Sequence, residues 1–150
     1  MRISIKNAHN VDAKQLAEVF NLSFYNDYVK YGECPGYNKT EEDILMGMTE
    51  YAVFKIIADG KIVGAISVCE KPNNNYFLGA LCVIPSYANK GIGQIAMRFL
   101  DTEFPDATCW ALETPTDKVQ NHYFYKKFGY IATKEYFDGS VLISYFQRQL

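Results

Sequence analysis

The stretch from Cys82 to Gly93 constrains this chain more than any other part of its sequence. A long apolar run, Tyr76–Ile84, ends at Pro85, a short polar loop follows, and Gly91 and Gly93 open an amphipathic segment. When a strand leads through such a loop into a helix, free backbone N–H groups and the positive end of the helix dipole meet at one point. Glycines there let a ligand approach without a Cβ in the way. The stretch therefore predicts a phosphate-binding loop.

The rest of the chain follows strand and helix patterns within one domain, residues 1–150. Apolar runs predict strands at Arg2–Lys6, Tyr51–Ala58, Lys61–Glu70, Tyr76–Ile84, Ala107–Glu113, Tyr130–Phe137 and Val141–Arg148. Apolar stripes predict helices from Asp12 to about Tyr28, from Thr40 onwards, from Gly91 to Pro105, and from Asp117 to about Phe128. Asp59-Gly60 and Asp138-Gly139 predict hairpin turns. This order of elements indicates a mixed α/β layer fold.

Composition argues against several classes of function. The net charge of −2 offers no overall basic field for nucleic acid. No run approaches about 18 apolar residues, and Met1–Lys6 lacks a signal-peptide core, so we expect a cytoplasmic protein that does not enter the membrane. The cysteines form no C-x-x-C pair and the only histidines are His9 and His122, so we expect no metal site.

The glycine loop also fits a dinucleotide-binding pattern. Residues 91–96 match G-x-G-x-x-A, and Glu113 lies 20 residues beyond Gly93, where a Rossmann fold keeps its ribose-binding acid. Three features oppose this interpretation. Residues 85–90 separate the strand from the glycines, the chain is too short for two βαβαβ halves, and two antiparallel hairpins do not belong in a doubly wound sheet. A dinucleotide-binding domain is therefore the weaker alternative.

The stretch Val83–Gly93, which reads VIPSYANKGIG, resembles the acyl-CoA loop of the GNAT superfamily of N-acetyltransferases, V-x-P-x-Y-[R/Q]-x-x-G-x-G/A. The resemblance implies that backbone N–H groups of this loop hold the CoA pyrophosphate. It implies cofactor-binding roles for Cys82, Val83, Ala88, Asn89, Lys90, Gly91, Ile92, Gly93 and Gln94. Ala88 stands where the family has Arg or Gln, which we expect to weaken the site without abolishing it. Lys90 either supplies compensating charge or is a solvated surface lysine.

A second resemblance lies about 30 residues further along the chain, at Phe124–Tyr130. Its sequence FYKKFGY is similar to the family segment F-Y-[E/K]-K-x-G-[F/Y]. The resemblance implies that Tyr125 protonates the departing CoA thiolate. A phenol titrates near ~10 and a thiol near ~8.5, so a tyrosine is protonated at neutral pH and can donate. The alternative is an aromatic residue that only packs in a tyrosine-rich helix.

Three further roles follow on the same basis. Asn121, one helical turn before Tyr125, shares its face and is either a pantetheine ligand or an exposed helix residue. Glu113 either acts through water as the base for the acceptor amine or orients the following helix. The family's acceptor pocket is built largely by the first helix and the loop after it. Here that region carries Tyr25, Tyr28 and Tyr31 with Asp27 and Glu33, which are suited to an amine or simply to packing.

Together the resemblances imply an α/β, GNAT-like fold with a mixed, mostly antiparallel sheet and helices on both faces. The fourth and fifth strands are expected to run parallel and to splay apart to admit acetyl-CoA. We expect direct N-acetyl transfer to a small-molecule or peptide amine, with the carbonyl polarised by a backbone N–H near Cys82–Val83. Cys82 as a covalent nucleophile is a lesser alternative. A non-catalytic acyl-CoA-binding protein also fits, and Val141–Phe146 is expected to pair across a homodimer.

Overall fold

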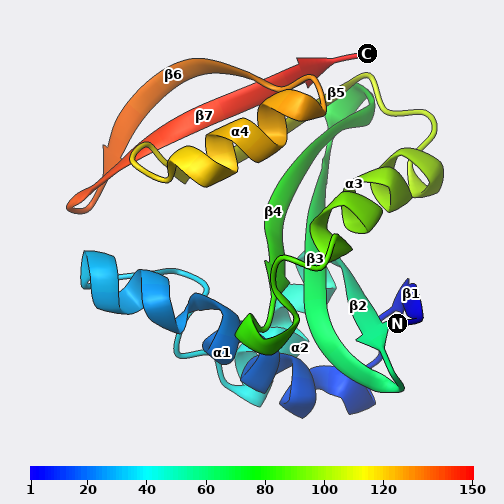
Figure 1. Ribbon diagram of the computed structural model, residues 1–150. Coiled ribbons are helices and arrows are strands. Elements are labelled where there is room, and N and C mark those ends of the chain that lie inside the picture. The colour runs from blue at the N-terminus through cyan, green and yellow to red at the C-terminus, as the bar shows by residue number, and fades with distance from the viewer.

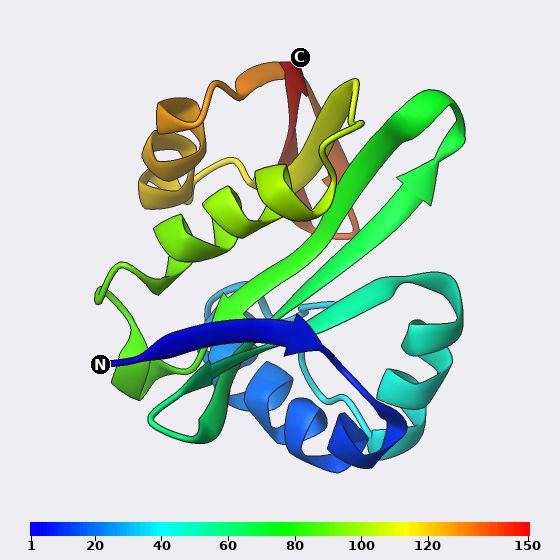
Figure 2. The same cartoon turned by 90° about the vertical axis from the view of Figure 1, so that its right-hand side faces the viewer.

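A seven-stranded sheet with helices on both faces forms the centre of the molecule (Figures 1 and 2). The computed structural model describes residues 1–150. The strands are β1 (Ile3–Asn7), β2 (Ala52–Ala58), β3 (Lys61–Lys71), β4 (Asn75–Val83), β5 (Cys109–Pro115), β6 (Ile131–Asp138) and β7 (Val141–Gln149). The helices are α1 (Ala13–Tyr31), α2 (Glu41–Glu50), α3 (Ile92–Glu103) and α4 (Val119–Lys127).

The strand order is β1-β2-β3-β4-β5-β7-β6, and every neighbouring pair is antiparallel except β4 and β5. This arrangement confirms the expected mixed, mostly antiparallel sheet and its parallel fourth and fifth strands. None of the helices has the length and apolar character that a membrane span requires.

The ends of α1 differ from the sequence expectation. The helix continues three residues beyond Tyr28 because Gly32 adopts the left-handed conformation, with φ of 76°, and its N–H donates to the Tyr28 carbonyl. Asp12 precedes α1 without capping it. Its carboxylate instead accepts from the His9 N–H at 2.8 Å and from Lys55 Nζ at 2.9 Å. Extending α1 places Tyr31 beside the sheet's central opening.

The predicted helix cap and hairpin turns lie at or within one residue of the positions expected from the sequence. Thr40 and Asp43 form a reciprocal capping box at the start of α2. Asp59 and Gly60 form the two-residue turn between β2 and β3, both with positive φ. At the second hairpin Asp138 still pairs with Val141, so the turn consists of residues 139–140. That one-residue shift leaves Asp138 at the end of β6.

Two hydrophobic cores cover the two faces of the sheet. One core packs α3 against β2–β5 and β7 and includes Leu100, Trp110 and Phe146, while aromatic residues of α4 lie at its margin. The other packs α1 and α2 against β3 and β4 and includes Leu16, Phe20 and Cys82. Both faces of the central strands are therefore buried, which explains the nearly continuous apolar run in β4.

A β-bulge at Gly79 opens the centre of the sheet. Leu78 pairs with Val68 and Ala80 pairs with Ser67, so Gly79 has no partner on β3. The parallel pairing of β4 with β5 stops at Leu78, and beyond it the two strands separate. Figure 1 shows the upper part of the molecule, with α4, β6 and β7, lifted away from α1 on the far side of this separation. The fold therefore contains a gap between β4 and β5.

The expected dimer pairing through residues 141–146 is wrong. These residues lie in β7, which pairs with β5 on one side and with β6 on the other. Their backbone groups are used within the sheet, and the strand at this edge is β6. A homodimer of another kind stays a prediction.

Candidate active site

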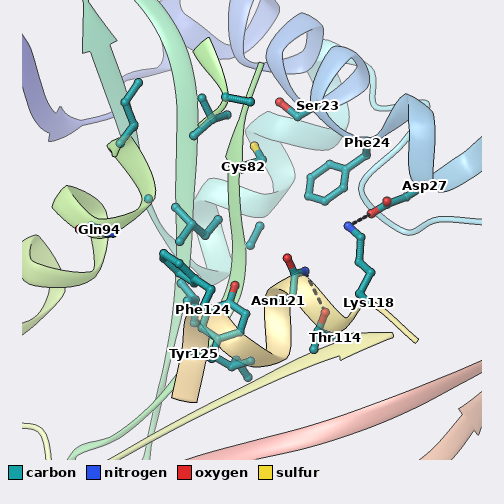
Figure 3. A pocket seen from close by; sticks show the side chains of 18 of the residues that line it. Ser23, Phe24, Asp27, Cys82, Gln94, Thr114, Lys118, Asn121, Phe124 and Tyr125 are labelled. Carbon is teal, nitrogen blue, oxygen red and sulfur yellow. Dashed lines mark hydrogen bonds and ion pairs between the residues drawn. The ribbon is translucent and has the colours of Figure 1, made fainter. Parts of the chain in front are cut away.

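A cavity of about 680 Å³ fills the gap between β4 and β5. Its walls come from α1, β4, the loop after β4, α3, β5 and α4 (Figure 3). The cavity is lined by most of the residues that the sequence suggested for the site, namely Cys82, Val83, Ala88, Asn89, Gly91, Ile92, Gly93, Gln94, Glu113, Asn121 and Tyr125. Lys90 does not line it. The structure thus brings together two sequence segments separated by about 30 residues.

The glycine loop leads into α3 at one end of this cavity. Gly91 has φ of 82°, a left-handed conformation that favours glycine, and no side chain caps the helix. A Cβ on Gly93 would lie 3.2 Å from the Phe124 ring, so glycine at this position lets α3 approach α4 closely. The uncapped first turn leaves its N–H groups available to an anion. This is the geometry that the sequence pattern predicts.

The backbone of β4 supplies a second set of donors. The Ile84 N–H donates to the Val63 carbonyl, which places that pair in the β3–β4 ladder. Because hydrogen-bonding direction alternates along a strand, the N–H groups of Leu81 and Val83 point away from β3 and toward the gap. The Cys82 N–H points toward β3. Of the two candidates for polarising a carbonyl, Val83 is therefore placed for it and Cys82 is not.

Tyr125 is a partly buried tyrosine on α4 whose hydroxyl points into the cavity (Figure 3). Its ring packs among Phe124, Tyr130 and Phe146, at centroid distances of 5.2, 5.9 and 6.4 Å. Burial raises the pKa of Tyr125 to about 12. The hydroxyl is consequently protonated at neutral pH and is able to donate a proton to a nearby anion.

Asn121 lies one turn before Tyr125 and is fixed by a hydrogen bond. Its Nδ2 donates to Thr114 Oγ1 at 3.0 Å, and Thr114 is itself buried. The amide oxygen is left facing the cavity (Figure 3). Asn121 therefore presents an acceptor to any amide-bearing chain that occupies the gap.

Glu113 lies near the end of β5, on the wall of the cavity. Its carboxylate accepts a hydrogen bond from the hydroxyl of Tyr136 on β6. It makes no contact that caps the next helix, because α4 begins after Lys118 without a side-chain cap. Glu113 is thus an exposed residue of the cavity wall, and its role as a base stays a prediction.

Cys82 is buried beside α1. Burial raises the pKa of its thiol to about 12, so the thiolate that covalent catalysis requires is disfavoured. The polar groups close to the thiol are the Ser23 hydroxyl and the Ala65 backbone, and neither histidine lines the cavity. The environment of Cys82 thus opposes the nucleophile alternative.

A smaller cavity of about 250 Å³ lies on the other side of the gap. The loop after α1, β4, the end of β5 and the β6–β7 hairpin form its walls. It shares eight lining residues with the larger cavity, including Phe24, Asp27, Gly79 and Glu113. The two cavities therefore meet where β4 and β5 separate.

The three tyrosines expected at an acceptor pocket lie in different places. Tyr25 and Tyr28 line neither cavity and pack against Tyr37, with ring centroids 5.8 and 4.6 Å away. Tyr31 lines the smaller cavity, and its hydroxyl donates to Asp117 Oδ1 at 2.6 Å. Only Tyr31 therefore lies where the expectation puts it.

Several lining residues, namely Ser23, Phe24, Thr114 and Lys118, were not expected at the site from the sequence. Asp27 and Lys118 form an ion pair of 2.9 Å between α1 and the segment before α4 (Figure 3), although 91 residues separate them. Phe24 and Ser23 of α1 and Thr114 of β5 also face the larger cavity. No local pattern marks such residues, because only the tertiary fold brings them to the gap. No group of three or more His, Cys, Asp or Glu side chains has an arrangement suited to a metal ion.

Comparison with known proteins identifies the family. Residues 14–130 match the sequence model of the acetyltransferase (GNAT) family. The uncharacterized protein YrkN of Bacillus subtilis (strain 168) is 29% identical over 115 residues, which are 75% of this chain and 61% of that relative. The chain thus spans less than two thirds of this relative's length.

Solved structures share the fold. The PaiA N-acetyltransferase from Thermoplasma acidophilum, in complex with coenzyme A, superposes with a TM-score of 0.83 at 20% identity and covers 100% of both chains. The ribosomal-protein-S18-alanine N-acetyltransferase from Escherichia coli gives 0.81 at 13% identity, over 99% of this chain and 94% of that one. These likenesses show the GNAT fold. With a family match that extends over more than half of its length, the chain belongs to the acetyltransferase (GNAT) family.

Proposed function

We propose that this protein is an N-acetyltransferase that moves the acetyl group of acetyl-CoA directly to a primary amine. One observation carries the proposal: a protonated tyrosine and an uncapped, glycine-opened helix end face the same cavity in the gap of a GNAT sheet. The coenzyme A bound to the PaiA relative supports the choice of co-substrate. The cytoplasmic location expected from the sequence stays a prediction.

The cofactor would lie in the larger cavity. The N–H groups of the first turn of α3 are suited to the pyrophosphate, since they carry the positive end of the helix dipole. The Asn121 amide oxygen is available to an amide N–H of the pantetheine arm. Because these contacts use backbone groups and Asn121, the small side chain of Ala88 is compatible with binding.

The chemistry would take place where the two cavities meet. Glu113, through a water molecule, takes a proton from the acceptor ammonium, and the free amine attacks the thioester carbonyl. The Val83 N–H stabilises the oxyanion as the new C–N bond forms. The C–S bond then breaks, and Tyr125 donates its proton to the thiolate of CoA. The second proton that leaves the acylated nitrogen returns to the Tyr125 phenolate through solvent.

The first test measures thiol release and the acetylated product with acetyl-CoA and a set of primary amines. We expect Tyr125→Phe to lower kcat by about 100-fold or more, since a general acid typically contributes 10²–10⁴-fold. Tyr123→Phe is the matched control, because Tyr123 is an exposed tyrosine of α4 that lines neither cavity. Unchanged turnover in Tyr125→Phe would show that the general-acid assignment is wrong.

The main alternative is a protein that binds acyl-CoA without turning it over. Stabilisation by CoA and acetyl-CoA in a thermal-shift titration, with no transfer to any amine, would favour that alternative. The doubly wound dinucleotide-binding fold is contradicted by the mostly antiparallel sheet. Stabilisation by NAD and not by CoA would overturn the proposed co-substrate as well.

A further inference from the structure

Strand β6 forms one edge of the sheet, and all eight of its residues are exposed. The strand at the other edge, β1, is shorter, and its first three residues are partly buried. Figure 1 shows β6 at the outer border of the molecule, beyond β7. An exposed edge strand presents N–H and C=O groups to which another strand can bond.

The bonding pattern of β7 shows which backbone groups of β6 point outward. The Leu142 carbonyl accepts a hydrogen bond from the segment after β5, so the backbone of Leu142 points toward β5. Because bonding direction alternates along a strand, Ile143 points toward β6, where it pairs with Tyr136. The N–H and C=O groups of the two neighbours of Tyr136, Glu135 and Phe137, therefore point away from β7 into solvent.

The free edge has a limited regular segment. A bulge at Thr133 interrupts the pairing of β6 with β7, and the strand ends at Asp138. A second copy of β6 that pairs antiparallel must therefore pair with Lys134–Asp138. Since outward-pointing residues can face only outward-pointing residues, the two-fold axis has to pass through a residue and not between two residues.

Charge selects one of these positions for the axis. An axis at Lys134, Glu135 or Asp138 places two identical charges directly opposite each other, which is destabilising. An axis at Phe137 places Lys134 beyond the end of the other strand. With the axis at Tyr136, Lys134 of each copy faces Asp138 of the other, and Glu135 faces Phe137. Only this register pairs opposite charges.

The two charges that meet in this register have no ionic partner within the chain. Neither Lys134 nor Asp138 takes part in any of the protein's ion pairs. Their side chains lie on the same face of β6 as Tyr136, because side chains alternate along a strand. Across the new edge they form a non-hydrogen-bonded pair, the type in which opposite residues approach to about 4.5 Å between Cα atoms. Two-fold symmetry makes this pair twice.

The other face of the same segment offers apolar surface. Phe137 is 69% exposed, although it is a large aromatic residue in the middle of a hairpin strand. In this register the aliphatic stem of Glu135 from the other copy covers its ring. Five residues a side make a small contact, below about 1,200 Å² in total, and such interfaces are weak. The association should therefore depend on concentration.

We propose that this protein forms a two-fold symmetric dimer in which β6 pairs antiparallel with β6 of a second copy about an axis at Tyr136. The inference does not depend on the proposed function. It brings the second copy close to the candidate active site, because Tyr136 donates to Glu113 and Asp138 lines the smaller cavity. Lys134 of the second copy thereby adds a positive charge beside Asp138 on the cavity wall.

Sedimentation velocity over a broad concentration series tests the dimer, and charge reversal tests its register. Lys134→Glu opposes two acids and Asp138→Lys opposes two lysines, so each variant alone should weaken the dimer by about tenfold or more. An equimolar mixture of the two variants restores opposite charges in both pairs and should form a heterodimer. Lys126→Glu is the matched control, since Lys126 is an exposed lysine of α4 and the charge change is the same.

A backbone variant tests the strand pairing itself. Phe137→Pro removes an N–H that points outward and leaves the hydrogen bonds between β6 and β7 in place, so it should also give a monomer. A wild type that is monomeric at every concentration would overturn the proposal. A dimer that both charge variants retain, or two monomeric variants that fail to combine, would overturn it as well. Equal weakening by Lys126→Glu would mean that net charge and not this edge governs association.

Discussion

The two cavities that meet at the β4–β5 gap are built in opposite ways. The larger one offers backbone N–H groups from α3 and β4 together with one amide and one partly buried phenol from α4, in two segments about 30 residues apart. The smaller one offers side-chain carboxylates from the loop after α1, from β5 and from the end of β6. A ligand common to a whole family can be held by backbone geometry, whereas a ligand peculiar to one protein is selected by side chains.

The largest expected effect on the larger cavity comes from replacing Gly91, at the start of α3. Replacement by valine forces a β-branched residue into a left-handed conformation, which costs about 1–3 kcal/mol and distorts the start of α3. We expect CoA to bind about tenfold more weakly to this variant than to the wild type. Isothermal titration with CoA measures the change in affinity.

Gly60→Val provides the matched control for that experiment. Gly60 has φ of 79° and, like Gly91, no atom within 4 Å of an added Cβ, but it lies in the β2–β3 turn and lines neither cavity. It should lose a similar amount of stability with no loss of CoA affinity. Equal weakening of CoA in both variants would mean that the glycine loop acts only through the fold.

The same contrast explains what the sequence alone revealed. The strand, loop and helix from residue 76 to residue 103 carry their own signals, namely a continuous apolar run, Pro85, two glycines and a helical stripe. The cofactor side could therefore be predicted from local patterns. Tyr125 was found through the resemblance of Phe124–Tyr130 to a family segment, and Asn121 because it lies one helical turn before Tyr125.

The lining of the smaller cavity could be predicted only in part: Asp27, Tyr31, Glu33 and Glu113 are named from the sequence, but their meeting in one cavity is not visible along the chain. Glu33 and Ser140 are 107 residues apart, and Tyr136 meets Glu113 only because β7 aligns β6 with β5. Tyr25 and Tyr28 are residue types suited to an amine pocket, yet their rings pack against Tyr37 and lie outside both cavities. Side-chain sites assembled by sheet register leave no periodic trace along the chain.

An effect of intermediate size is expected in the pH dependence of stability, through Tyr125 in the larger cavity. The folded pKa of Tyr125, about 12, exceeds the unfolded value of ~10, so the neutral phenol contributes stability that is complete below pH ~10 and is lost as pH rises through about 12. Tyr125→Phe lacks this loss. We expect the free energy of unfolding of the wild type to fall more steeply than that of Tyr125→Phe from pH ~9 to ~11.

Urea unfolding at a series of pH values measures these slopes, with Tyr123→Phe as the reference. Tyr123 is exposed on the same helix, so its replacement should follow the wild type. Identical slopes for the wild type and Tyr125→Phe would contradict the burial of the Tyr125 hydroxyl. The general-acid role would not be affected, because a tyrosine with an ordinary pKa near ~10 is also protonated at neutral pH.

The smallest effect concerns the ion pair at the junction of the cavities. Lys118→Gln removes the partner of Asp27, and a partly exposed pair of this kind contributes about 0–1 kcal/mol to stability. Unfolding by urea should show a loss within that range at low salt and almost none in 1 M salt, where screening extends only ~3 Å. Lys30→Gln is the control, since Lys30 pairs with Asp117 at 3.4 Å and lines neither cavity.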